Sequence, residues 1–477
     1  MSQSSIQANP SPGNEVKIVA SLVRRAREAM NEFSDADQAR VDEAVTALAW
    51  SIYEPARARE LAESAVADTG LGNVDSKIIK NQRKTFGCLR DLMRVKTVGV
   101  IEDDKAKGIF KYAKPVGVVA AIAPSTNPAA TPVNKAMMAL KGRNAVVIAP
   151  SPAGASTTTR TVDYMRAELK KIGLPANLVQ VLPQPVNKAL TQSLMEAADL
   201  VVVTGSQNNV RRAYSSGTPA IGVGAGNVSV IIDSTADLKD AAEKITMSKI
   251  FDNSTSCSSE NQVIVLEDIY DDAIQELKKA GGYMTAADEK EKIKNTLWVD
   301  GHLNRKVIAK DPDVFAKEAG LAPEAFEAKF FMVEDENPGS NSPFCDEKLS
   351  LVLSVYKARN FEDALAQTDL IMDVCGRGHS VGIHTNNMDH ARKLAENIAT
   401  VRVLVNQAHT FGNGGSFTNG LPFTLSMGCG TWAGNSISEN LNYRHFINIT
   451  HLVTEIPEDK PSEVDLFGDY WSKHGKL

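Results

Sequence analysis

Residues 200–214 read LVVVTGSQNNVRRAY, and this stretch indicates the fold class of the chain. The continuous apolar run Leu200–Val203 is typical of a strand that is buried on both faces. It passes through the small residues Thr204, Gly205 and Ser206 into a helix-like segment. The carboxyl end of such a strand and the N-terminus of the next helix form a common dinucleotide site. A plain tight turn between a strand and a helix is the alternative interpretation.

Similar strand-like and helix-like segments alternate on both sides of this stretch. Buried strands are predicted at Val116–Ala123, Ala145–Ala149 and Asn177–Leu182. Helices are predicted between them at Pro132–Lys141, Ser156–Ile172 and Asn187–Ala197. Strands that alternate with helices predict a doubly wound parallel sheet. A second alternation after residue 257 predicts a second α/β domain, and the first hundred residues are predicted to be mostly helical.

The composition is that of an ordinary globular enzyme. The 477 residues are 43% hydrophobic and 23% charged, and a chain of this length favours two or three domains. The net charge of −6 and the lack of a basic tract with interleaved aromatic residues argue against a nucleic-acid partner. No apolar run is long enough to span a bilayer, and the N-terminus lacks the apolar core of a signal peptide. We therefore expect no membrane partner and a cytoplasmic protein.

Five scattered cysteines without a CxxC pair argue against a disulfide framework or a metal site and suit a reducing compartment. Cys257 differs from the others because it lies in FDNSTSCSSENQVIV, residues 251–265, among small polar neighbours. A buried structural cysteine usually has bulky apolar neighbours, whereas nothing bulky shields this sulfur. The setting favours a catalytic thiol, and a surface-loop cysteine is the alternative.

Three further residues are candidates for the same chemistry. Asn127 stands in a proline-braced loop after a predicted strand, where its amide can donate to a developing oxyanion or simply form an Asx-turn. His379, in a glycine-rich turn, suits acid–base work or is only a turn residue. Glu347 can hold ribose hydroxyl groups or remain a solvated carboxylate. The run Gly222-Val-Gly-Ala-Gly-Asn227 is not a proper G-x-G-x-x-G motif, but it indicates a close backbone approach.

Together these motifs resemble the aldehyde dehydrogenase superfamily, and specifically its CoA-acylating branch. The ordered set that carries the resemblance covers nearly the whole chain. It consists of Pro124-Ser-Thr-Asn-Pro128, Ala213–Asn227, Cys257, Asp346-Glu-Lys-Leu-Ser350, Gly378-His-Ser380 and Gly428–Ser436. Such a long ordered set is far more specific than any single motif.

The resemblance implies a role for each matching residue. Cys257 matches the nucleophile, Asn127 the oxyanion-hole amide that works with the Cys257 N–H, and His379 a histidine important in the acylating branch. Glu347 matches the carboxylate on the nicotinamide ribose. Residues expected to bind the nicotinamide dinucleotide are Ser125, Thr126, Ser151, Thr204, Gly205, Ser206, Gly224 and Glu347. No metal is expected.

One departure from the hydrolytic branch indicates where the acyl group goes. Hydrolytic relatives carry a glutamate that activates water in the loop that here spans residues 222–227, and this loop has no carboxylate. Without a general base, which contributes roughly 100-fold or more, water is a poor nucleophile. A thiol is the stronger attacker near neutral pH. We therefore expect the thioester on Cys257 to be transferred to coenzyme A, and the same groups to serve acyl-CoA reduction.

The segment after the strand at residues 145–149 bears on the choice of nicotinamide. Residues 150–160 contain no Asp or Glu, are rich in hydroxyl groups and end in Arg160. A 2′-phosphate is tolerated where an acidic residue is missing, so the sequence favours NADP, with NAD still possible. Ser156 as a plain helix cap is the alternative.

The loop from His409 to Trp432 is expected to form the substrate mouth. Its many hydroxyl and amide donors suit a small anionic aldehyde better than an alkyl chain. Within the branch, the resemblance is to members that convert sulfoacetaldehyde to sulfoacetyl-CoA. Arg402 is a candidate electrostatic helper or only a packing residue. Acetaldehyde, succinate semialdehyde, an acyl-phosphate reductase and a catalytically silent scaffold are the alternatives.

These features predict four parts of the chain. They are a disordered lead-in at 1–14, a dinucleotide-binding domain at 15–250 with a strand hairpin near 108–123, a catalytic domain at 251–430 that carries the cysteine, and a return segment and oligomerisation arm at 431–477. The alternation in Arg444–Ile456 indicates an extended arm. By family analogy, we expect a homodimer or a homotetramer.

Overall fold

The computed structural model describes residues 13–476, and two parallel β-sheets organise it. The predicted lead-in lies outside the described residues except for its last two positions, and α1 begins at Asn14. Four helices open the chain: α1 (Asn14–Phe33), α2 (Gln38–Tyr53), α3 (Pro55–Thr69) and α4 (Val74–Met93). Side-chain caps start α2 and α4, since Asp37 accepts from the Arg40 N–H at 2.8 Å and Asn73 from the Ser76 N–H at 2.9 Å.

The first sheet has the strand order β5-β4-β3-β6-β7, and all its strands are parallel. Its strands are β3 (Val118–Ile122), β4 (Ala145–Ala149), β5 (Val179–Val181), β6 (Leu200–Val203) and β7 (Ala220–Gly222). The chain builds outwards from β3 to β5 and then returns to β6, so the strand order reverses between β3 and β6. Doubly wound sheets bind ligands at such a reversal. The predicted α/β fold class is confirmed.

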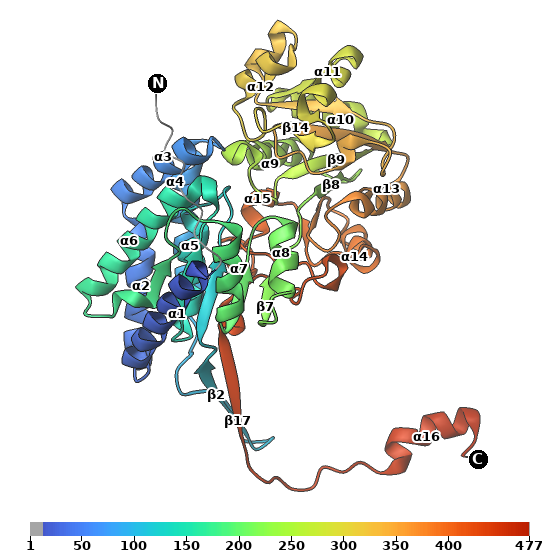
Figure 1. Cartoon of the computed structure of the whole chain (residues 1–477). Coiled ribbons are helices and arrows are strands. Elements are labelled where there is room, and N and C mark those ends of the chain that lie inside the picture. Colours follow the sequence, from blue (N-terminus) through green and yellow to red (C-terminus); the bar gives the residue numbers. More distant parts are fainter. Residues whose placement is uncertain (1–12, 477) are drawn as a thin grey trace, which may run out of the picture.

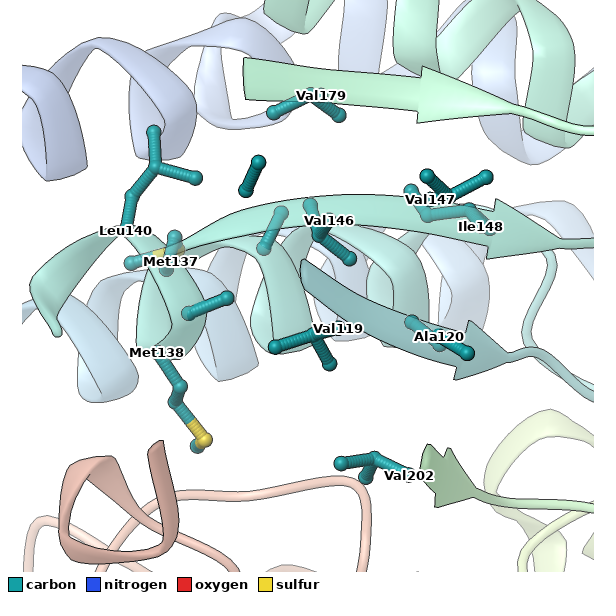
Figure 2. Packing of buried hydrophobic residues seen from close by; sticks show 14 of the residues in the cluster. Val119, Ala120, Met137, Met138, Leu140, Val146, Val147, Ile148, Val179 and Val202 are labelled. Carbon is teal, nitrogen blue, oxygen red and sulfur yellow. The ribbon is translucent and has the colours of Figure 1, made fainter. Parts of the chain in front are cut away.

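Helices α5 (Ala130–Lys141), α6 (Ala155–Lys171), α7 (Lys188–Ala197) and α8 (Gln207–Tyr214) connect these strands. Figure 2 shows α5 against β3 and β4, with Met137 of the helix and Val146 of the strand in one cluster of buried side chains. Every residue of β3 and β4 is buried, as their continuous apolar sequences predict. The buried Lys135 of α5 donates to the carbonyl oxygens of Ile122 (2.7 Å) and Val202 (3.0 Å), which ties the ends of β3 and β6 together.

The second sheet has the order β10-β13-β14-β9-β8-β15-β16 and is also parallel. Its strands are β8 (Val228–Ile232), β9 (Glu260–Leu266), β10 (Gly282–Met284), β13 (Phe330–Glu334), β14 (Val352–Ala358), β15 (Val381–His384) and β16 (Val403–Val405). The helices around it are α9 (Leu238–Ile250), α10 (Tyr270–Lys279), α11 (Ala287–Leu297), α12 (Pro312–Ala319), α13 (Phe361–Val374), α14 (Met388–Asn397) and α15 (His409–Gly412). A short hairpin joins β11 (Trp298–Val299) to β12 (His302–Leu303). Because β8 already belongs to this sheet, the chain passes from the first sheet to the second between residues 222 and 228. The predicted domain division at residue 250 stays a prediction.

A small antiparallel sheet has the order β1-β2-β17, with β1 (Val100–Asp104), β2 (Ile109–Pro115) and β17 (Ile447–Val453). The predicted strand hairpin near 108–123 is wrong, because β2 and β3 lie in different sheets. The chain turns at Val116 and Gly117, whose N–H groups both donate to the side-chain oxygen of Asn144 at 2.7 and 3.0 Å. After β17 the chain leaves the body and ends in α16 (Glu463–His474), which stands apart from it in Figure 1.

Candidate active site

The segment before Cys257 has an irregular backbone. Asp252, Asn253 and Ser254 follow one another with φ angles of 50°, 50° and 60°, in the left-handed region. Asp and Asn enter this region more readily than most residues with side chains. The turn separates α9 from β9, and the neighbours of the cysteine, Ser256 and Ser258, line a cavity. The sequence DNS therefore fits the sharp change of direction that presents the cysteine.

A buried carboxylate fixes this segment to α4. Asp252 accepts from the ammonium groups of Lys80 at 2.5 Å and Lys77 at 3.1 Å, and from the hydroxyl of Thr255 at 2.6 Å. The backbone N–H of Asn73 adds a fourth donor at 3.0 Å. Burial raises the pKa of Asp252, but Lys80 and Lys77 outweigh burial and hold that pKa below its ordinary value. The ion pairs of Asp252 with Lys77 and Lys80 thus anchor the segment before Cys257 to α4.

The glycine loop at residues 222–227 lies directly against Cys257. A Cβ placed on Gly226 would stand 2.0 Å from the Cys257 carbonyl oxygen and 2.6 Å from its Cβ. Only glycine permits this approach without a shift of the backbone. A Cβ on Gly224 would stand 2.8 Å from the sulfur of Cys429, so this glycine packs against the loop at residues 428–434 rather than at a free surface.

The Cys257 thiol is half-buried. Burial raises its pKa to about 12, and the carboxyl group of Glu347 contributes in the same direction. Arg402 and the Ser258 hydroxyl oppose this effect. The thiolate is the reactive form of a cysteine, so any group that brings positive charge to this place would raise the reactivity of Cys257.

Asn127 lines the same cavity as Ser256 and Ser258, the two neighbours of Cys257. Asn127 lies in the loop between β3 and α5, and this loop is held at two points. Lys135 binds the carbonyl of Ile122 at its start, and Lys77 donates to the carbonyl of Thr126 at 3.2 Å. Because Lys77 also binds Asp252, one lysine links the loop of the candidate oxyanion amide to that of the candidate nucleophile.

Six of the eight residues predicted to bind a dinucleotide lie at the carboxyl ends of three neighbouring strands. Ser125 and Thr126 follow β3, Ser151 follows β4, and Thr204, Gly205 and Ser206 follow β6. The hydroxyl of Thr204 pairs with that of Ser426 at 2.5 Å, and Ser206 caps α8 by accepting from the Asn209 N–H. A Cβ on Gly205 would meet no atom within 4 Å, so open space lies over this turn. Hydroxyl groups and an open turn before a helix N-terminus fit a bound dinucleotide.

The hydroxyl-rich segment after β4 is engaged with α3. Ser156 donates to Asp68 at 2.5 Å, and the N–H of Thr157 donates to the same carboxylate at 3.0 Å. Arg160 forms an ion pair with Glu60 at 2.9 Å. The carboxylates of Asp68 and Glu60, both from α3, therefore lie beside residues 150–160, which contain no carboxylate themselves.

Glu347 lies close enough to the Cys257 thiol to affect its pKa. Burial raises its pKa to about 8, and the neighbouring Asp346 adds to the rise. Its charge in turn raises the pKa of Cys257. No residue between 13 and 476 donates a hydrogen bond to its carboxyl group, which leaves both oxygens available for ribose hydroxyl groups.

His379 is a fully buried, neutral imidazole. Its Nδ1 pairs with the Ser380 hydroxyl at 2.8 Å, and this hydroxyl pairs with Nε2 of His409 at 2.9 Å. Burial and the nearby Arg402 hold the pKa of His379 well below its ordinary value. Its Nε2 is buried and has no partner among the described residues. No hydrogen bond joins His379 to Cys257 in the part of the chain that the structure describes.

Arg402 binds protein groups around this site. Its guanidinium donates to the carbonyl oxygens of His379 (2.7 Å) and Gly428 (3.0 Å) and to the side chain of Asn440 (3.1 Å). It therefore holds the histidine turn against the loop at residues 428–434. The sequence left two interpretations open for Arg402, an electrostatic helper or a packing residue. These hydrogen bonds support the packing role.

Comparison with known proteins identifies the family. The aldehyde dehydrogenase family pattern matches residues 9–297. Over 459 residues the chain is 52% identical to an acylating sulfoacetaldehyde dehydrogenase of Cupriavidus necator, which covers 96% of this chain and 93% of that one. The chain belongs to the aldehyde dehydrogenase family. An acylating sulfoacetaldehyde dehydrogenase of Bilophila wadsworthia is 45% identical, and the match covers 97% of this chain and 100% of that protein. The resemblance to the acylating branch is confirmed.

Solved structures of aldehyde dehydrogenases share the fold. An acetylating aldehyde dehydrogenase of Geobacillus thermoglucosidasius superposes with a TM-score of 0.91 at 34% identity, over 95% of this chain and 100% of that one. A propionaldehyde dehydrogenase of Rhodopseudomonas palustris, with bound CoA and an acylated cysteine, superposes with a TM-score of 0.80 at 25% identity, over 91% and 97% of the two chains. An engineered glycolyl-CoA reductase with bound NADP+ has a TM-score of 0.81 at 25% identity, over 91% and 96%. Together they indicate a nicotinamide cofactor and CoA for this aldehyde dehydrogenase.

Sequence reasoning missed the cations of α4 that reach the site of this aldehyde dehydrogenase. Lys80, Arg83 and Lys84 line the cavity beside Asn127. In the sequence they look like an ordinary solvated helix face. The available signal was the spacing of Lys77, Lys80 and Lys84, which places three lysines on one side of a helix.

Between residues 13 and 476 no group of three or more His, Cys, Asp or Glu side chains is arranged to hold a metal ion. None of the helices in the same range has both the length and the apolar character that crossing a membrane requires.

Proposed function

We propose that this aldehyde dehydrogenase oxidises sulfoacetaldehyde to sulfoacetyl-CoA with NAD(P), through a thioester on Cys257. The observation that carries the proposal is the carboxylate-free glycine loop at the cysteine, because a Cβ on Gly226 would stand 2.0 Å from the Cys257 carbonyl oxygen. A base for water is thus missing from the loop where hydrolytic relatives carry one. The printed names of the relatives at 52% and 45% identity support the choice of aldehyde.

In the proposed reaction the Cys257 thiolate adds to the aldehyde carbon, and the carbonyl oxygen becomes an alkoxide. The Asn127 amide and the Cys257 N–H donate hydrogen bonds to this oxygen. Glu347 and the β6–α8 turn would hold the nicotinamide, which would supply the acceptor for the hydride that leaves the carbon. The CoA thiolate then attacks the resulting thioester, the carbon–sulfur bond to Cys257 breaks, and the Cys257 thiolate is restored.

His379 is proposed as the proton acceptor for the CoA thiol. A neutral imidazole whose Nε2 has no partner in the described chain supports this role. His379→Gln should then slow acyl transfer to CoA more than the first reduction of nicotinamide, which single-turnover measurements separate. Equal slowing of both steps would contradict the role.

The deciding experiment is nicotinamide reduction over a panel of small aldehydes, with and without CoA. Sulfoacetaldehyde should give the highest kcat/KM, and turnover should stop after one equivalent when CoA is omitted. Acetaldehyde or succinate semialdehyde used with equal efficiency would favour the alternatives from the same branch. Turnover with inorganic phosphate in place of CoA would indicate an acyl-phosphate reductase. Free acid formed at full rate without CoA would overturn the proposal, and a Cys257→Ala variant that stayed fully active would indicate a scaffold.

NADP is the nicotinamide that we propose, because residues 150–160 contain no carboxylate to repel a 2′-phosphate. One observation favours NAD as the second candidate, since Asp68 binds Ser156 at 2.5 Å and Glu60 binds Arg160 at 2.9 Å. The ratio of kcat/KM for NADP and NAD decides between them. Asp68→Asn should raise this ratio if the Asp68 carboxylate is what repels the phosphate.

A cytoplasmic location and a homo-oligomeric state are also proposed for the enzyme. A reducing cytoplasm suits a mechanism that needs a free Cys257 thiol, and the five cysteines Cys88, Cys257, Cys345, Cys375 and Cys429 are free. A homodimer or homotetramer held by the arm at residues 431–477 suits the strand β17, whose residues after Ile447 are all exposed. Neither nucleic acid nor membrane is proposed as a partner.

A further inference from the structure

A cavity beside the nucleophile contains more positive charge than the protein neutralises. It is lined by Asn127, by both neighbours of Cys257 and by three cations of α4, namely Lys80, Arg83 and Lys84. None of the residues that we expect to bind the dinucleotide lines it. The cavity therefore belongs to the aldehyde rather than to the nicotinamide.

The three cations have different partners. Lys80 forms an ion pair with Asp252 at 2.5 Å. Lys84 donates to the carbonyl of Gly414 at 2.8 Å, and Arg83 donates to the hydroxyl of Ser416 at 3.2 Å. Across residues 13–476 no carboxylate pairs with Arg83 or Lys84, and the buried Nη1 of Arg83 has no partner at all. Both groups thus lie partly out of water with only neutral acceptors, an arrangement that costs free energy. Burial lowers the pKa of both, that of Lys84 to about 7, so a bound anion would favour the charged form of Lys84.

Aromatic rings fix the guanidinium of Arg83. Its central carbon lies 5.4 Å from the ring centres of Phe411 and Phe423 and 5.5 Å from that of Phe417. Rings at this distance attract the cation and restrict its side chain without accepting its hydrogen bonds. The donors of Arg83 are therefore preorganised for an acceptor that is not part of the chain.

We propose that Arg83 and Lys84 form the subsite that binds the anionic end of the aldehyde, a sulfonate or a carboxylate. The inference rests on the proposed function and names the residues that select its substrate. The anion accepts hydrogen bonds from the Arg83 guanidinium and the Lys84 ammonium, while the aldehyde carbon at the other end faces Cys257 and Asn127. A short anionic substrate supplies the negative charge that the cavity lacks, so it binds better than a neutral aldehyde of the same length.

The test is the ratio of kcat/KM for sulfoacetaldehyde to kcat/KM for propanal, measured in Arg83→Gln, in Lys84→Met and in wild type. Each substitution should lower this ratio by roughly 10- to 100-fold, the range for losing a hydrogen bond between charged groups. The matched control is Arg90→Gln, because Arg90 lies over Phe417 and Phe423 as well, at 5.2 and 4.9 Å, but is paired with Asp91 and does not line the cavity. Arg90→Gln should leave the ratio at the wild-type value.

Three outcomes would overturn the inference. An unchanged ratio in both variants would show that the cations do not select the substrate. An equal fall in the ratio for Arg90→Gln would assign the effect to long-range charge. A rise in KM for CoA or for the dinucleotide, with no change in the ratio, would assign the subsite to a coenzyme phosphate.

A second measurement separates this inference from the proposed function. Ethanesulfonate, which has no aldehyde group, should slow the alkylation of Cys257 by iodoacetamide in wild type and not in Arg83→Gln. If wild type fails to oxidise sulfoacetaldehyde but ethanesulfonate still protects Cys257 in this Arg83-dependent way, the proposed substrate is wrong and the anion subsite stands. If wild type oxidises sulfoacetaldehyde and the ratio does not change in the variants, the subsite is wrong and the function stands.

Discussion

At the residue scale, ionisation of the Glu347 carboxyl group opposes ionisation of the Cys257 thiol. Burial raises the pKa of the thiol to about 12, the Glu347 carboxyl adds to the rise, and the pKa of Glu347 itself is raised to about 8. Above pH 8 Glu347 therefore becomes charged and opposes formation of the thiolate, whereas below pH 8 it is largely neutral. The reactivity of the free enzyme should rise with pH less steeply than that of an isolated thiol.

This competition predicts the behaviour of Glu347→Gln. The variant should react faster than wild type with iodoacetamide above pH 8 and at nearly the same rate below pH 7, because only the charged carboxylate opposes the thiolate. Alkylation rates from pH 6 to pH 10 measure the effect. The control is Glu455→Gln on the exposed arm, which should follow the wild-type curve. Curves for Glu347→Gln and wild type that coincide at every pH would contradict the coupling.

Asp252 carries a stability prediction at the same scale. Its carboxylate neutralises Lys77 and Lys80 where all three side chains are buried, so Asp252→Asn leaves two buried cations without a counterion. The free energy of unfolding should fall by about 3 kcal/mol, at the lower end for a broken buried ion pair. Urea denaturation at pH 7 measures the change. Asp103→Asn at an exposed position is the matched control and should stay within about 0.5 kcal/mol of wild type.

At the element scale, the contact between the glycine loop and the nucleophile segment should control the rate. In Gly226→Ala the new Cβ would stand 2.0 Å from the Cys257 carbonyl oxygen, so one of the two loops must move. We expect kcat to fall roughly 100-fold, the loss that a misplacement of about 1 Å causes. Gly13→Ala, where the new Cβ meets no atom within 4 Å, is the control. Full activity in Gly226→Ala would mean that the loop contributes nothing to the position of Cys257.

The elements also show how far the sequence predicts this structure. Long apolar runs such as Leu200–Val203 predicted the first sheet, because strands buried on both faces have an unmistakable pattern. The sequence did not reveal that β2 pairs with β17, since the partner lies more than 300 residues away. Nor did it indicate that the α4 cations face the cavity, because burial of a charged side chain depends on which loops cover it. The rings of Phe411, Phe417 and Phe423 lie against Arg83, and they come from a loop far from Arg83 in the sequence.

At the scale of the whole molecule, β17 and α16 leave apolar surface in water. β17 is an edge strand of its sheet, and Ile449, Leu452 and Val453 on it are 44%, 49% and 67% exposed. An open edge with exposed apolar residues favours pairing with another chain. Helix α16 adds Val464, Leu466, Phe467 and Tyr470, which are 49–67% exposed. A second copy of the chain would cover both surfaces, which is the physical basis for the expected homo-oligomer.

Deletion of residues 454–477 tests this expectation. The deletion removes α16 but keeps β17 paired with β2 inside the chain, so the body retains its sheets and its core. Light scattering after size-exclusion chromatography should give a smaller particle for the truncated enzyme than for the full chain. A milder variant, Phe467→Asp, should shift the same equilibrium in the same direction, because burying a new charge in an apolar contact costs several kcal/mol, about 3 or more. If the two proteins keep the full-length oligomer, α16 is not part of the subunit contact and the edge of β17 alone must hold it.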